Sequence, residues 1–123
     1  MNTPFGDLMV WDAHTHFLSH TFFQKLAREA GLSQPDGTGS VTLAGQRLGW
    51  EMPPEDPVPL ARRWVEEMSR HGVDRSILFG SLPGEEEAVA AACRAFPHRL
   101  TGFSMVNPLT GDPAAAARRV ADL

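Results

Sequence analysis

Short apolar runs alternate with amphipathic stretches along this chain. The apolar runs cover residues 8–11, 76–79 and 100–106, and each is typical of a short strand in a buried sheet. After each run, apolar residues recur at helical spacing between recognisable cap residues. We therefore predict three strands that are each followed by a helix, an alternation typical of a parallel sheet in an α/β fold.

Serine, aspartate, proline and glycine predict where the helices begin and end. The expected limits are Ser19 or Thr21 to Gly31, then Pro57 and Pro59 to Gly72, then Pro83 and Gly84 to the residue before Pro97, and finally Asp112 and Pro113 onward. Residues 31–59 exceed the roughly 12–15 residues usual for a structureless connection. We expect them to form a functional loop or an excursion with local structure, including a short strand at 41–43.

The composition fits a soluble globular protein and excludes several partners. The 123 residues are 42% hydrophobic and 21% charged, and the formal net charge of -4 offers no basic surface for nucleic acid or anionic lipid. The single cysteine, Cys93, cannot form an internal disulfide, and no long apolar segment predicts a membrane span. We expect a cytoplasmic protein with neither nucleic acid nor a membrane as partner.

Two histidines directly follow the first apolar run. Side chains two residues apart in a strand project from the same face, so the imidazoles of His14 and His16 are expected to point together, with Asp12 on that face too. Imidazole suits zinc and similar divalent metals, and a catalytic zinc commonly takes three protein ligands. The alternative is a chance pair of histidines that is merely packed and hydrogen-bonded at a strand end.

The run Val-Trp-Asp-Ala-His-Thr-His-Phe at residues 10–17 resembles the first-strand signature of the metal-dependent amidohydrolase superfamily. It is most similar to the branch of aminocarboxymuconate-semialdehyde decarboxylase and related decarboxylases and hydrolases. The resemblance implies a TIM (β/α)8 barrel, of which residues 1–123 would be a partial domain with about three βα units. It also implies that His14 and His16 bind a divalent metal ion, usually zinc. The family's other ligands, two histidines and an aspartate after later strands, would lie beyond Leu123.

The same resemblance implies a small-molecule substrate. The intact enzyme would hydrolyse an ester, lactone or amide, or decarboxylate an aromatic or unsaturated acid. Arg47 could pair with a substrate carboxylate, and Trp50 or Phe17 could pack on an aromatic ring. Three strands without closure leave two sheet edges open, so we expect a homo-oligomer or completion by further chain.

The remaining features favour structural roles. We expect His20, His71 and His98 at helix ends or on the surface, Glu85, Glu86 and Glu87 as partners of a helix dipole, residues 80–84 as a turn, and Cys93 in the core. Two other functions stay open. The chain could be a small non-catalytic α/β binding or interaction domain, or a fragment of a metal phosphoesterase that also begins with His-x-His.

Overall fold

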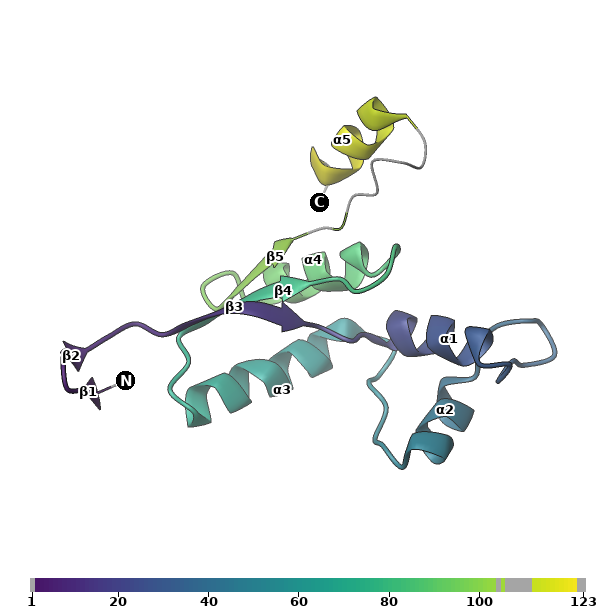
Figure 1. Ribbon diagram of the computed structural model, residues 1–123, viewed down its shortest axis with the longest axis horizontal. Coiled ribbons are helices and arrows are strands. Elements are labelled where there is room, and N and C mark those ends of the chain that lie inside the picture. Colours follow the sequence, from purple (N-terminus) through teal and green to yellow (C-terminus); the bar gives the residue numbers. More distant parts are fainter. Residues whose placement is uncertain (1, 104, 106–111, 122–123) are drawn as a thin grey trace.

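A three-stranded parallel sheet forms the centre of the molecule (Figure 1). The computed structural model describes residues 2–103, 105 and 112–121. The sheet has the order β3–β4–β5, with β4 between its two neighbours. The strands are β1 (Asn2–Thr3), β2 (Gly6–Asp7), β3 (Trp11–His16), β4 (Arg75–Phe79) and β5 (Leu100–Phe103), of which β1 and β2 form a separate antiparallel pair. The predicted alternation of parallel strands and helices in an α/β fold is confirmed.

Apart from the helix at residues 41–48, which the sequence did not predict, the described helices begin at or close to the residues predicted to start them. They are α1 (His20–Glu29), α2 (Val41–Leu48), α3 (Pro57–Arg70), α4 (Glu86–Ala95) and α5 (Pro113–Ala121). The Ser19 hydroxyl accepts the Phe22 N–H at 3.3 Å, and the Asp112 carboxylate accepts the Ala114 N–H at 2.9 Å. Within the described residues, none of these helices is long and apolar enough to cross a bilayer.

Helices α3 and α4 cover one face of the sheet. The core between these layers consists of Phe17, Ala61, Met68, Leu78, Val89, Ala92 and Leu100. Cys93 packs against this cluster as expected, and burial raises the pKa of its thiol. The opposite face carries Phe103, which is 52% exposed, and no described helix covers it. The sheet is therefore apolar on both sides but packed on only one.

Two strand predictions are wrong. The first strand starts at Trp11 rather than at residue 8. Just before it, the Val10 carbonyl accepts N–H groups from Asp74 and Arg75, but the Val10 N–H donates to the Asp74 carboxylate at 2.7 Å instead of to the backbone of a neighbouring strand. Residues 41–43 begin helix α2 instead of forming a strand, since the Ser40 hydroxyl caps that helix by accepting the Leu43 N–H. The third strand ends at Phe103. Of its predicted continuation to residue 106, Met105 is not in a strand, and residues 104 and 106 lie outside the described residues.

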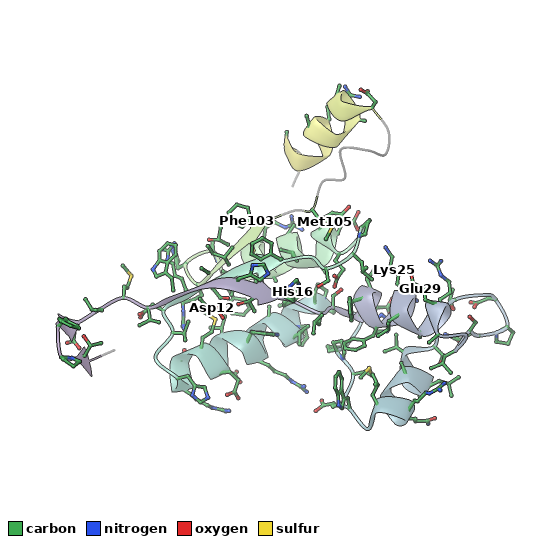
Figure 2. All side chains as sticks on the ribbon, in the orientation of Figure 1. Asp12, His16, Lys25, Glu29, Phe103 and Met105 are labelled. Carbon is green, nitrogen blue, oxygen red and sulfur yellow. The ribbon has the colours of Figure 1, made fainter. Side chains whose placement is uncertain are left out.

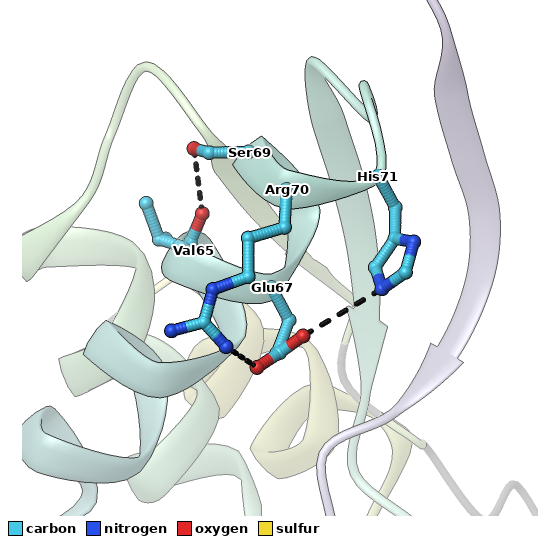
Figure 3. Close-up of polar contacts among 5 residues, drawn as sticks. All are labelled: Val65, Glu67, Ser69, Arg70 and His71. Carbon is cyan, nitrogen blue, oxygen red and sulfur yellow. Dashed lines mark hydrogen bonds and ion pairs between the residues drawn. The ribbon is translucent and has the colours of Figure 1, made fainter.

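The end of α3 follows the sequence-based expectation (Figure 3). Glu67 forms ion pairs with Arg70 and, at 3.7 Å, with His71, and the Ser69 hydroxyl donates to the Val65 carbonyl at 2.8 Å. Gly72 then takes a positive φ of 69°, which ends the helix. His71 is thus a helix-end histidine, and these exposed ion pairs add little stability.

We predict that Gly102→Ala destabilises the protein by about 1–3 kcal/mol. A Cβ at this position would lie 2.6 Å from Val89 Cγ1 and 3.2 Å from Cys93 Sγ, so α4 would have to move away from β5. Urea unfolding followed by circular dichroism measures the change. The control is Thr101→Ala, on the exposed side of the same strand, which should cost less than about 1 kcal/mol. Equal losses for the two variants would contradict the tight packing of α4 on β5.

Candidate functional site

His14 and His16 bring their rings together at the carboxyl end of β3. Their Nε2 atoms are 3.2 Å apart and both side chains are exposed. Thr15, between them, points the other way, and its hydroxyl is hydrogen-bonded to that of Ser76 at 2.7 Å in the buried layer. The alternation of side chains along the strand therefore places both imidazoles on the open face of the sheet.

Aromatic stacking orients the first of these rings. The His14 ring stacks on Phe79 with centroids 4.3 Å apart, and Phe79 stacks in turn on Phe103 at 5.5 Å. His16, Phe79 and Phe103 are register partners and form a row at the carboxyl ends of the three strands, where Figure 2 labels His16 and Phe103. This edge of a parallel sheet is where α/β proteins usually bind ligands.

A hydrogen bond orients the second ring. His16 Nδ1 lies 2.9 Å from the hydroxyl oxygen of Ser81. Ser81 belongs to the turn between β4 and α4, and the sequence predicts that turn correctly but gives no sign of the contact. Sixty-five positions separate the two residues, so no local pattern could have revealed the pair.

The carboxylate of Glu85 lies directly behind Ser81 and is completely buried, with 0% exposure. One oxygen accepts the N–H of Ser19 at 3.0 Å and its hydroxyl at 2.7 Å, and the other accepts the N–H groups of Ser81 at 2.6 Å and Leu82 at 3.2 Å. Glu85, predicted as a partner of the helix dipole, is the N-cap residue of α4 and is also a buried acceptor, which the sequence did not predict. Glu86 and Glu87 do lie in the first turn of α4, as predicted.

Asp12 does not join the two histidines. The register of β3 against β4 shifts between Asp12 and Thr15, which breaks the simple alternation on which the prediction depended. The Asp12 carboxylate instead accepts the backbone N–H of His14 at 3.1 Å. Among the residues that the structure describes, no three His, Cys, Asp or Glu side chains gather into a metal-binding group.

The residues expected to contact substrate are dispersed. Phe17 is only 1% exposed and belongs to the core, because it follows His16 onto the covered side of the sheet, so its predicted substrate contact is wrong. Arg47 lies exposed on α2, beyond the carboxyl end of β3 (Figure 1). Trp50 follows that helix, is 60% exposed and makes an edge contact with Phe23 at 6.4 Å. For Arg47 and Trp50, substrate contact stays a prediction.

The other described histidines do not join the pair in a metal-binding group. His20 is the first residue of α1. His98 lines a cavity of about 420 Å³ at the amino ends of β4 and β5, opposite the end that carries His14 and His16. Arg99, which also lines this cavity, already donates to the carbonyls of Asp74 at 2.7 Å and Val73 at 3.0 Å. The cavity is therefore built around a structural arginine.

The histidine pair fits a divalent metal ion. Two nitrogens bound to a tetrahedral zinc at about 2.0–2.1 Å are roughly 3.3 Å apart, close to the 3.2 Å between the two Nε2 atoms. The bond from His16 Nδ1 to the Ser81 hydroxyl also fits, because a ligating histidine usually donates its second ring N–H to an oxygen. The same 3.2 Å equally allows a hydrogen bond between the two rings.

Comparisons with protein-family models, with curated proteins and with solved structures found no match. The site is therefore defined by its own geometry. Its parts are two exposed imidazoles at the end of a parallel strand, an aromatic row beside them, and a buried carboxylate behind the turn that contacts His16.

We predict that Glu85→Ala destabilises the fold by roughly 2–4 kcal/mol, because four donors lose their buried acceptor. Urea unfolding measures the effect. Glu87→Ala is the matched control, since Glu87 is exposed in the first turn of α4, in the same acidic run, and its loss should change stability by less than about 0.5 kcal/mol. Similar losses of stability in both variants would show that the buried hydrogen bonds of Glu85 stabilise the fold no more than an exposed glutamate does.

Proposed function

We propose that His14 and His16 are two ligands of a divalent metal ion, most suitably zinc, in an enzyme of the amidohydrolase type. The observation that carries this proposal is the 3.2 Å separation of two exposed Nε2 atoms at the carboxyl end of a parallel strand. Two imidazoles leave the remaining metal positions to other donors, as a catalytic site requires. The first-strand resemblance supports the same assignment.

The sheet supports a barrel as the architecture of this enzyme. In a TIM barrel the helices lie outside parallel strands, and the inner face of the strands turns toward the barrel axis. Here α3 and α4 lie on one face of β3, β4 and β5, while the histidines and Phe103 lie on the other. We propose that the three strands are the first three of such a barrel, and that the open face is its interior.

The proposed reaction is hydrolysis of a small ester, lactone or amide, or decarboxylation of an aromatic or unsaturated acid. When bound, a divalent metal supplies Lewis-acid polarisation of a substrate oxygen. His14 and His16 bind through Nε2, and Phe79 shields one face of the His14 ring. Arg47 and Trp50, on the excursion beyond the strand end, are the candidates to hold a substrate carboxylate and an apolar ring.

A second function is favoured by one observation. The two Nε2 atoms are also at hydrogen-bonding distance, so the pair could hold itself together without a metal ion. The chain would then be a non-catalytic α/β binding domain that presents the open, aromatic face of its sheet. Metal binding separates the two functions.

We predict that the 123-residue chain binds one equivalent of Zn²⁺ or Co²⁺, and that His14→Ala and His16→Ala each weaken binding by at least about 100-fold. The reason is that each variant removes one of two described ligands. Isothermal titration calorimetry measures the affinity, and the Co²⁺ absorption spectrum reports nitrogen ligation. His71→Ala, which removes an exposed histidine at the end of α3, is the control and should bind as the wild type does.

Two results would overturn the metal assignment. One is a wild-type chain with no measurable affinity for either ion. The other is binding that His14→Ala and His16→Ala leave unchanged, which would place the ion elsewhere.

A further inference from the structure

We infer that Ser81 and Glu85 are positioning residues that set the orientation and the tautomer of His16. This inference rests on the proposed metal site and extends it to residues outside the His-x-His motif. It starts from the 2.9 Å contact between His16 Nδ1 and the Ser81 hydroxyl, and from the burial of Glu85 immediately behind that serine.

The proton on the ring decides whether His16 can bind a cation. A neutral imidazole carries one N–H and one lone pair, so Nε2 offers its lone pair only when Nδ1 holds the proton. An oxygen that accepts from Nδ1–H stabilises this tautomer. The Ser81 hydroxyl lies at the right distance to accept, while Nε2 faces Nε2 of His14 at 3.2 Å.

The backbone of the turn that carries Ser81 is held by hydrogen bonds to Glu85. Its backbone N–H donates to Glu85 at 2.6 Å, and the next N–H, from Leu82, donates to the same oxygen at 3.2 Å. The other Glu85 oxygen accepts both the N–H and the hydroxyl of Ser19, three residues after His16. One carboxylate therefore fixes the chain on both sides of the His16 ring, and a shift of the turn would move the Ser81 hydroxyl away from it.

His14 has no equivalent dependence on this turn. Its ring is oriented by stacking on Phe79 at 4.3 Å with an interplanar angle of 18°. Loss of the Ser81 hydroxyl should therefore disturb His16 and leave His14 in place. A change in the His16 ring without a change in the His14 ring is therefore the result expected when the Ser81 hydroxyl is removed.

The test compares Ser81→Ala with the wild-type chain. We expect Zn²⁺ affinity to fall about 10–100-fold, the usual cost of losing an oxygen that orients a ligating histidine. In the metal-free protein, long-range ¹H–¹⁵N spectra of the imidazoles should show wild-type His16 protonated at Nδ1 and Ser81→Ala as a mixture of tautomers. Ser81→Thr keeps the hydroxyl and should restore both properties.

Two further variants complete the design. Glu85→Gln keeps the size of the side chain but replaces one acceptor oxygen with an NH₂ group, and it should shift the His16 tautomer as Ser81→Ala does. Ser69→Ala removes another hydrogen-bonded hydroxyl, at the end of α3, and should change neither zinc affinity nor the His16 spectrum.

The outcomes separate this inference from the proposed function. If Ser81→Ala changes neither the zinc affinity nor the His16 tautomer, the positioning role of Ser81 is wrong, but His14 and His16 remain the proposed ligands. A wild-type chain that binds no zinc would overturn the proposed function, and with it the role of Ser81 toward a metal. If Ser81→Ala changes the His16 tautomer and also weakens zinc binding, while Ser69→Ala changes neither, the result supports both the positioning role of Ser81 and the proposed metal site.

Discussion

Glu85 holds a fully buried carboxylate between the start of α1 and the turn that follows β4. A buried charge is costly unless donors surround it, and here four donors do. Because they come from segments more than sixty residues apart, this carboxylate determines how the end of β3 meets the end of β4. Lys25, labelled in Figure 2, adds a second link, since its ammonium group donates to the Pro83 carbonyl in the same turn.

Helices cover only one face of the sheet, and this determines which side chains are exposed at the carboxyl ends of the strands. Helices α3 and α4 bury Leu78 and Leu100 from one side, and Thr15 and Ser76 satisfy each other within that layer. Strand alternation then leaves His14 and His16 no place except the open face. Polar groups that stabilise the fold thus lie inward or at the turn, whereas polar groups available to a ligand lie outward beside the Phe79 ring.

Local patterns predicted most of the fold, because strand runs and helix caps act over a few residues. They failed at residues 41–43, where β-branched residues favoured a strand but the Ser40 cap and a left-handed Gly49 enclose a helix. For the site, spacing predicted that the His14 and His16 rings approach each other. It could not reveal Ser81 or Glu85, because three successive glutamates look alike until tertiary contacts bury one of them.

The exposure of His14 and His16 bears on whether the pair stabilises the fold or binds a metal ion. A hydrogen bond between two neutral rings contributes about 0.5–1.5 kcal/mol at most, and less where water competes for both partners. Glu85 and the pair of Thr15 and Ser76 already stabilise this end of the sheet from buried positions. Two imidazoles held together on an exposed face therefore add little to the fold. The stacked ring of Phe79 orients His14, and the Ser81 hydroxyl orients His16. Histidines that bind a metal ion need such support from neighbouring groups.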